Sequence, residues 1–172
     1  MADLDISERH GLGLATIMAR NHVDASAIGA ALGLDLADGP MLTTNEELML
    51  AGTGPGMWLA VRDDAPAYWA EGLAKILNGI ASVSDQSGGT IIFRFSGADA
   101  RELLQRGAFI DLHPSTFGPR SVATTVIAHI GVILWQRDEA PTFEVAVFRS
   151  YAASFRDWID AARGGLGEPR PT

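Results

Sequence analysis

Residues 82–107, SVSDQSGGTIIFRFSGADARELLQRG, predict a short strand, a turn, a second strand and a helix in succession. In TIIFRF, residues 90–95, apolar side chains fall on every second position, which is typical of a strand that buries one face. The residues after it carry helix signals: a small residue to begin it, Asp99 in its first turn, paired leucines on one side and Gly107 at its end. This stretch therefore predicts a packing unit, and it holds no catalytic grouping.

The same order of elements is expected on both sides of this stretch. Towards the N-terminus, hydrophobic periodicity and turn residues predict strands at 12–19, 47–51 and 57–61 and helices at 24–33 and 64–79. Towards the C-terminus, the same signals predict strands at 121–129, 132–136 and 142–148 and a helix at 150–164. Asp24, Asp64 and Ser150 are the expected N-caps, and residues 1–8 are expected to be a loose arm.

The element order predicts an α+β fold made of two packed β-α-β-β-α units with antiparallel sheets. The expected divisions are an N-terminal α+β unit at 1–79, a C-terminal α+β unit at 80–165 and a flexible tail at 166–172. Because no long linker lies near residue 80, we expect the two units to pack together.

The composition narrows the classes of partner. The chain has a net charge of −8, and its single lysine, Lys75, lies in no basic cluster, which argues against a nucleic-acid or membrane partner. It has no cysteine, so thiol catalysis, thiolate metal sites and disulfides are excluded. A polar, acidic start and the lack of a long apolar run fit a cytoplasmic protein.

Candidate chemical motifs are better explained as turns and core residues. Glycines at 52, 54 and 56 join two predicted strands, whereas a dinucleotide motif joins a strand to a helix. Residues 111–114 contain a possible pair of metal ligands, an aspartate and a histidine, but no third ligand at a suitable spacing. His129 falls in a predicted apolar strand, where we expect it to make one structural hydrogen bond. Residues 85–87 are usual turn formers. We therefore expect no catalytic, cofactor-binding or metal-binding residue in this chain.

The aromatic residues point towards packing and a partner. All four tryptophans lie on predicted elements, where core packing is the first expectation: Trp58, Trp69, Trp135 and Trp158. Arg149 and Tyr151 flank the expected cap, and both are residue types favoured at protein–protein interfaces.

Three segments, at about residues 82–107, 109–136 and 140–159, together resemble the gamma subunit of bacterial heterotetrameric sarcosine oxidase. The resemblance covers about residues 80–162. Its motifs are Asp111-Leu112-His113-Pro114, Ala128-His129, Leu134-Trp135 and Phe148-Arg149-Ser150-Tyr151-Ala152. Before residue 80, the resemblance consists of the order of elements and of Asp64-Ala65-Pro66.

The resemblance implies an accessory subunit with a fold similar to part of the glycine-cleavage T-protein. It implies alpha, beta and delta subunits as partners, in a complex that demethylates sarcosine to glycine and passes the one-carbon unit to tetrahydrofolate. The FAD, FMN, NAD and tetrahydrofolate of such a complex would belong to the larger subunits, with no cofactor in this chain. We expect Trp135, Arg149 and Tyr151 to lie at the contact with a large subunit.

Three alternatives remain open at this point. The chain could be the similar subunit of a related N-methyl amino acid dehydrogenase or demethylase, for example one that acts on N-methylglutamate. It could be a stand-alone folate-binding protein of T-protein type, which a basic groove for the folate tail would favour. It could also be a structural domain of an unrelated assembly. A large apolar patch on the surface would support this alternative and the accessory-subunit interpretation alike.

Overall fold

The computed structural model describes residues 3–166, and it contains two five-stranded antiparallel sheets. The first sheet has the order β3 (Leu42–Thr44), β4 (Met49–Gly54), β5 (Met57–Arg62), β2 (Gly13–Ala19) and β6 (Ala81–Asp85). The second has the order β1 (Asp5–Arg9), β7 (Thr90–Ser96), β10 (Thr142–Phe148), β9 (Ile130–Gln136) and β8 (Val122–Ile127). The helical elements are α1 (Ala25–Leu32), α2 (Trp69–Ile76), α3 (Ala100–Gln105), the 3₁₀ turn η1 (Arg149–Tyr151) and α4 (Ala152–Gly164).

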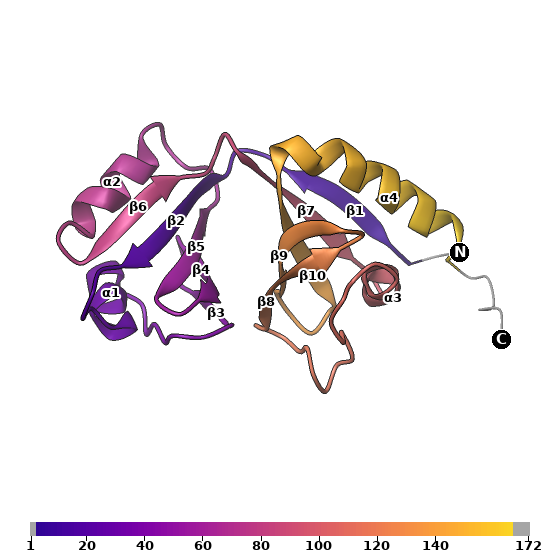
Figure 1. Ribbon diagram of the computed structural model, residues 1–172, viewed down its shortest axis with the longest axis horizontal. Coiled ribbons are helices and arrows are strands. Elements are labelled where there is room, and N and C mark those ends of the chain that lie inside the picture. Colours follow the sequence, from indigo (N-terminus) through magenta and orange to yellow (C-terminus); the bar gives the residue numbers. More distant parts are fainter. Residues whose placement is uncertain (1–2, 167–172) are drawn as a thin grey trace.

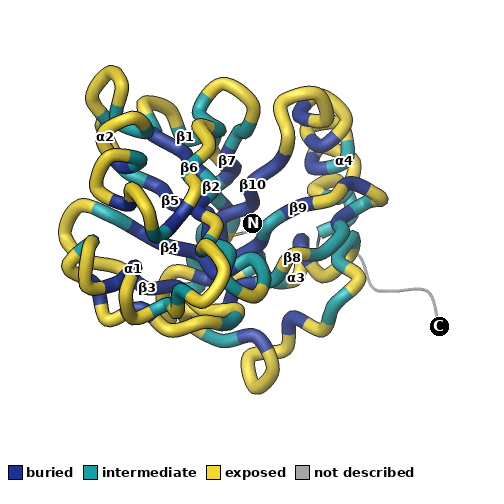
Figure 2. The backbone as a smooth tube through the Cα atoms, turned by 60° about the vertical axis from the view of Figure 1, so that its left-hand side comes forward, coloured by how far each residue is buried: buried dark blue, intermediate teal, exposed yellow. Residues whose placement is uncertain are grey.

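The two sheets face each other, and the helices cover their outer faces (Figure 1). One apolar core lies between the sheets, a second lies under α1 and α2, and a third lies under α3 and α4. Strand β7 shows how the sequence produces these layers: Phe93 and Phe95 face the helices, while Ile92 faces the other sheet. Ile92, on the face of this strand opposite its phenylalanines, is therefore also buried. The buried residues follow the strands through the interior (Figure 2).

Each sheet takes one strand from the other side of the division expected at residue 80. β1 pairs with β7 in the second sheet, and β6 pairs with β2 in the first. The chain therefore crosses between the sheets twice, at residues 10–12 and at residues 86–89 (Figure 1). β6 lies after the expected division at residue 80 but belongs to the first sheet, and the expectation of a loose arm at residues 1–8 was wrong for residues 5–8, which are part of β1. The polar segment DISER, Asp5–Arg9, has no apolar run to mark it, but backbone pairing with β7 makes it a strand.

A second connection joins the sheets at the edge where β3 and β8 lie. Met41 and Ser121 form an isolated antiparallel bridge, and the Arg120 guanidinium donates two hydrogen bonds to the Leu42 carbonyl, at 3.1 and 3.0 Å. The two halves are thus tied together at this edge as well as at the crossovers.

Three local expectations were wrong. Helix α2 begins at Trp69, because Asp64 and Tyr68 adopt positive φ angles of 47° and 61° that interrupt a helix before it. Ser150 lies inside η1, and no side chain caps the start of α4. His129 is in the β8–β9 turn, where it and Ala128 have φ angles of 66° and 49°.

Other local expectations were confirmed. The Asp24 carboxylate accepts a hydrogen bond from the Ala27 amide at 2.9 Å, and Gly33 ends α1 with a φ of 69°. In the described part of the chain, no helix is long and apolar enough to cross a membrane. The tail expected at 166–172 lies outside the described residues from residue 167 onward.

Candidate functional site at the junction of the sheets

Glu144, in the middle of β10, is a fully buried carboxylate. Its neighbours Phe143 and Val145 face the helices, so the alternation of the strand turns Glu144 towards the first sheet. The register places Arg94 of β7 on one side of it and Trp135 of β9 on the other. Arg94 donates to Oε1 through Nε and Nη2, at 3.0 and 2.8 Å, and the Trp135 indole donates to Oε2 at 2.9 Å.

Two further guanidinium groups complete the surroundings of this carboxylate. Arg9 Nη1 lies 3.0 Å from Oε1, and Arg137 Nη1 lies 3.3 Å from Oε2. Arg9 also pairs with Asp63, just after β5, which connects the cluster to the first sheet. A buried carboxylate is stable only when it is paired and hydrogen-bonded, and here both oxygens are engaged. Glu144 is therefore suited to hold the sheets together, and its engaged lone pairs make it a poor general base.

Trp135 belongs to this buried cluster, with no exposed surface of its own. Trp135 was expected at the contact with a large subunit, and in this chain its side chain does not reach the surface. The physical reason is its register: Trp135 lies opposite Val122 and Glu144 on the inner face of β9. Sequence reasoning also missed Glu144 and Arg94, although an acidic and a basic residue inside two apolar strands were a usable signal.

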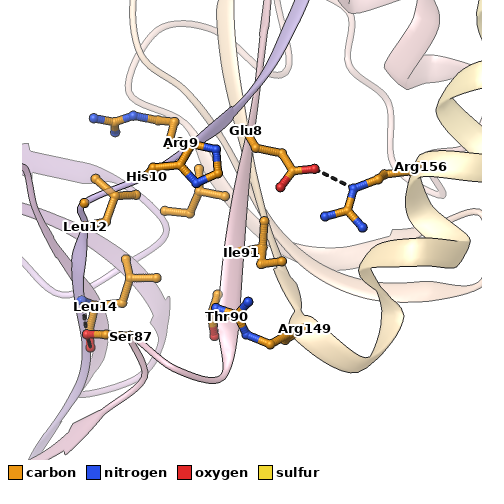
Figure 3. Close-up of a pocket in the computed structure, with 12 residues that line it drawn as sticks. Glu8, Arg9, His10, Leu12, Leu14, Ser87, Thr90, Ile91, Arg149 and Arg156 are labelled. Atoms are coloured by element: carbon orange, nitrogen blue, oxygen red, sulfur yellow. Dashed lines mark hydrogen bonds and ion pairs between the residues drawn. The ribbon is translucent and has the colours of Figure 1, made fainter.

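A second feature of the junction is a cavity of about 200 Å³ between the two crossovers and the start of the last helix (Figure 3). We call it the crossover cavity, and its polar lining residues are Glu8, Arg9, His10, Ser87, Thr90, Arg149 and Arg156. Arg149 fixes the second crossover: its Nε donates to the Gly88 carbonyl at 2.7 Å and its amide donates to the Gly89 carbonyl at 2.8 Å. The Ser87 hydroxyl accepts from the Leu14 amide at 3.0 Å.

Glu8 and Arg156 form an ion pair across this cavity. The hydrogen bond from the Arg156 guanidinium lowers the pKa of the Glu8 carboxyl below its ordinary value, and the charges of Arg156, His10 and Arg149 add to this effect. Glu8 is therefore ionised at neutral pH, and the pair connects β1 to α4.

The segment after β10 presents its side chains outward. Phe148 and Tyr151 are 60% and 52% exposed, and Arg149 lies exposed between them. Of the three residues expected at a subunit contact, the structure thus brings Arg149 and Tyr151 together on one exposed turn. Phe148 joins them and was missed, because the alternation of its strand gave no sign that the last position turns outward.

The other candidate motifs lie in turns. The His113 amide donates to Asp111 Oδ1 at 2.8 Å, and its ring nitrogen lies 2.7 Å from Ser115 Oγ, so this motif closes a loop on itself. Glycine at position 52 is required by packing, since a Cβ there would lie 1.8 Å from the Gly39 carbonyl oxygen. Among residues 3–166, no three His, Cys, Asp or Glu side chains are grouped so that they could hold a metal ion.

Comparison with known families identifies the group to which the chain is related. The model of the "Sarcosine oxidase, gamma subunit family" matches residues 18–164. This chain belongs to that family. The resemblance noted over residues 80–162 is thereby confirmed. The family match also covers residues 18–79, so it includes most of the first half of the chain.

Named relatives agree with this assignment. The chain is 30% identical to the sarcosine oxidase subunit gamma of Corynebacterium sp. (strain P-1) over 146 residues, which are 84% of this chain and 70% of the relative. It is 27% identical to the same subunit of Corynebacterium sp. (strain U-96) over 128 residues, which are 74% of this chain and 62% of that relative.

Two solved structures share the fold. A chain of the heterotetrameric sarcosine oxidase from Corynebacterium sp. U-96, in complex with pyrrole 2-carboxylate, matches with a TM-score of 0.85 and 21% identity, over 98% of this chain and 88% of that one. The glycine cleavage system aminomethyltransferase T from Bartonella henselae matches with a TM-score of 0.68 and 14% identity, over 97% of this chain and 46% of that one. The expected α+β fold, and its likeness to part of the T-protein, are confirmed.

Proposed function

We propose that this chain is the gamma subunit of a heterotetrameric sarcosine oxidase and contributes structure to the complex, with the chemistry carried by other subunits. The observation that carries this proposal is the family match over residues 18–164, together with relatives that are named as gamma subunits. The engaged Glu144 carboxylate supports a structural role, because both of its oxygens are paired and are not free to accept a proton from a substrate.

In this proposal the partners are the alpha, beta and delta subunits of the oxidase. They would hold the FAD, FMN, NAD and tetrahydrofolate with which sarcosine is demethylated to glycine and the one-carbon unit is transferred. The complex would work in the cytoplasm, and a cysteine-free chain is compatible with a reducing compartment.

The contact surface that we propose is the exposed turn made of Phe148, Arg149 and Tyr151. Exposed Phe, Tyr and Arg side chains are all enriched at protein interfaces, and Tyr and Arg are among the residue types that carry most binding energy there. Trp135 supports this surface from inside, through the strand that pairs with β10. We further propose that the halves at 1–79 and 80–165 are parts of a single rigid body, because of the exchanged strands.

Co-expression of this chain with the genes beside its own, followed by purification through a tag on this chain, tests the assembly. We expect several chains to elute together with bound flavin. A folded, colourless chain that elutes alone would contradict the proposal, and titration with tetrahydrofolate would then test the stand-alone folate-binding alternative.

A matched pair of variants tests the surface. Tyr151→Ala is expected to weaken association with the other subunits by about tenfold or more, which corresponds to roughly 1.4 kcal/mol. Tyr68→Ala is the control, because Tyr68 is even more exposed, at 79%, but lies at the start of α2 over the other sheet. Equal affinities for the two variants, measured by surface plasmon resonance, would rule out this turn as the contact.

A further inference from the structure

The junction between the sheets concentrates positive charge in an otherwise acidic chain. The crossover cavity at this junction is lined by three arginines, at positions 9, 149 and 156, and by one carboxylate, that of Glu8. The charged residues that line it therefore have an excess of two positive charges, although the whole chain carries −8. Such a local excess of positive charge attracts an anion to this cavity.

Arg149 and Arg156, two of the three arginines that line the crossover cavity, are held in position but keep their terminal nitrogens free. Arg149 donates through Nε to the Gly88 carbonyl, and Arg156 donates through Nε to Glu8. Within the part of the chain that the structure describes, neither guanidinium makes a hydrogen bond through Nη1 or Nη2. Because each side chain is already fixed at Nε, a ligand that binds to the terminal nitrogens does not have to order a mobile side chain.

Further donors line the same space. The Thr90 side chain lines the crossover cavity near Arg149, and in the described residues its hydroxyl has no hydrogen-bond partner (Figure 3). The His10 ring lies on the side of the first crossover (Figure 3). Glu8 is the one acidic side chain among the lining residues, and its charge is already paired with Arg156.

We propose that the crossover cavity binds a small oxyanion, a carboxylate or a phosphate, between the guanidinium groups of Arg149 and Arg156 and the hydroxyl of Thr90. Planar guanidinium groups bind these oxyanions with strong, charge-assisted hydrogen bonds. A cavity of about 200 Å³ admits such an anion with its water and is too small for a nucleotide or a folate. The bound anion would join the second crossover to α4 and so stiffen the joint between the sheets.

Isothermal titration calorimetry on the full chain tests this inference, with inorganic phosphate in one series and acetate in another, at constant ionic strength set with sodium chloride. We expect saturable binding of at least one of the two anions at one site, with a Kd of about 1 mM or tighter. The series in which binding occurs distinguishes a phosphate site from a carboxylate site. The test uses the chain alone, so its outcome does not depend on the proposed assembly.

Variants locate the site. Arg149→Gln and Arg156→Gln are each expected to weaken binding by about tenfold or more, because each removes a charge-assisted donor group. Arg20→Gln removes the same charge from an exposed arginine outside the cavity and is expected to leave the Kd unchanged. Thr90→Val keeps the shape and strand preference of the side chain, so it tests the site even if loss of the Arg149 anchor impairs folding. No saturable binding of either anion, or variants of Arg156 and Thr90 that bind as the unaltered chain does, would overturn the proposal.

Discussion

Replacement of Glu144 with glutamine tests whether the buried carboxylate holds the junction together. The glutamine side chain would keep the shape of the original and one acceptor oxygen, but it would leave three guanidinium groups around an uncharged amide. Removing one partner of a buried charge cluster costs about 3–5 kcal/mol, because the remaining charge is left without compensation. Arg94 and Arg137 are 34% and 35% exposed, so water partly screens them, while Arg9 is only 12% exposed.

We therefore expect Glu144→Gln to lower the free energy of unfolding by about 3 kcal/mol, which corresponds to roughly 6–12 °C in Tm for a domain of this size. Urea unfolding followed by circular dichroism measures this difference, and an unchanged slope with urea confirms that both proteins unfold as the same unit. Glu139→Gln is the control: Glu139 is exposed in the β9–β10 turn, and its loss is expected to change stability by less than about 0.5 kcal/mol.

A double-mutant cycle with Arg9→Gln separates pairing from other effects. Arg9 is the most buried of the three arginines. The effect of the double substitution on the free energy of unfolding is therefore expected to differ from the sum of the two single effects by about 1 kcal/mol or more. If Glu144→Gln and Glu139→Gln are equally stable, the junction does not depend on the carboxylate and the reasoning fails.

Two other predictions concern the frame of the fold. Gly52→Ala is expected to destabilise the chain by more than about 2 kcal/mol, because the new Cβ would lie 1.8 Å from the Gly39 carbonyl oxygen. Gly72→Ala, in the middle of α2 with open space around it, is expected to stabilise it by roughly 0.5–1 kcal/mol, and thermal melts of both variants check the contrast. The hydrogen bonds of Ser26 and Ala27 to Asp24 lower the pKa of this carboxyl, so its ionised form stabilises the folded state. Asp24→Ala should therefore reduce stability above pH about 4, and the difference from the unaltered chain should shrink as the pH falls further. A difference that stays constant down to pH about 2 would show that the charge of Asp24 has no part in capping α1.

Apolar patterning in the sequence was sufficient to predict most strands and the fold class, because the buried strands carry apolar residues either at every second position, as in β7, or in short continuous runs, as in β5 and β10. It could not reveal β1, whose five residues are mainly polar and become a strand only by pairing with β7. For the same reason it missed the exchange of β1 and β6 between the sheets, since pairing between distant segments leaves no local signal.

The candidate site was predictable only in part. Arg149 and Tyr151 were marked as surface residues by their type and position, and both lie on the exposed turn. Trp135 was placed on the same surface from its nearness to family-like motifs, but only the register with Glu144 determines that it points inward. The crossover cavity combines residues from 8 to 156, and such a combination becomes visible only when the two crossovers are placed in space.

The most direct test of the proposed subunit role is the native mass of the complex purified through a tag on this chain, measured together with its flavin spectrum and its oxygen consumption with sarcosine. We expect one species that contains this chain and three other subunits, holds flavin and consumes oxygen when sarcosine is added. If the tagged chain elutes alone, and the unbound fraction holds a flavin-containing complex that oxidises sarcosine without this chain, the proposed role is contradicted.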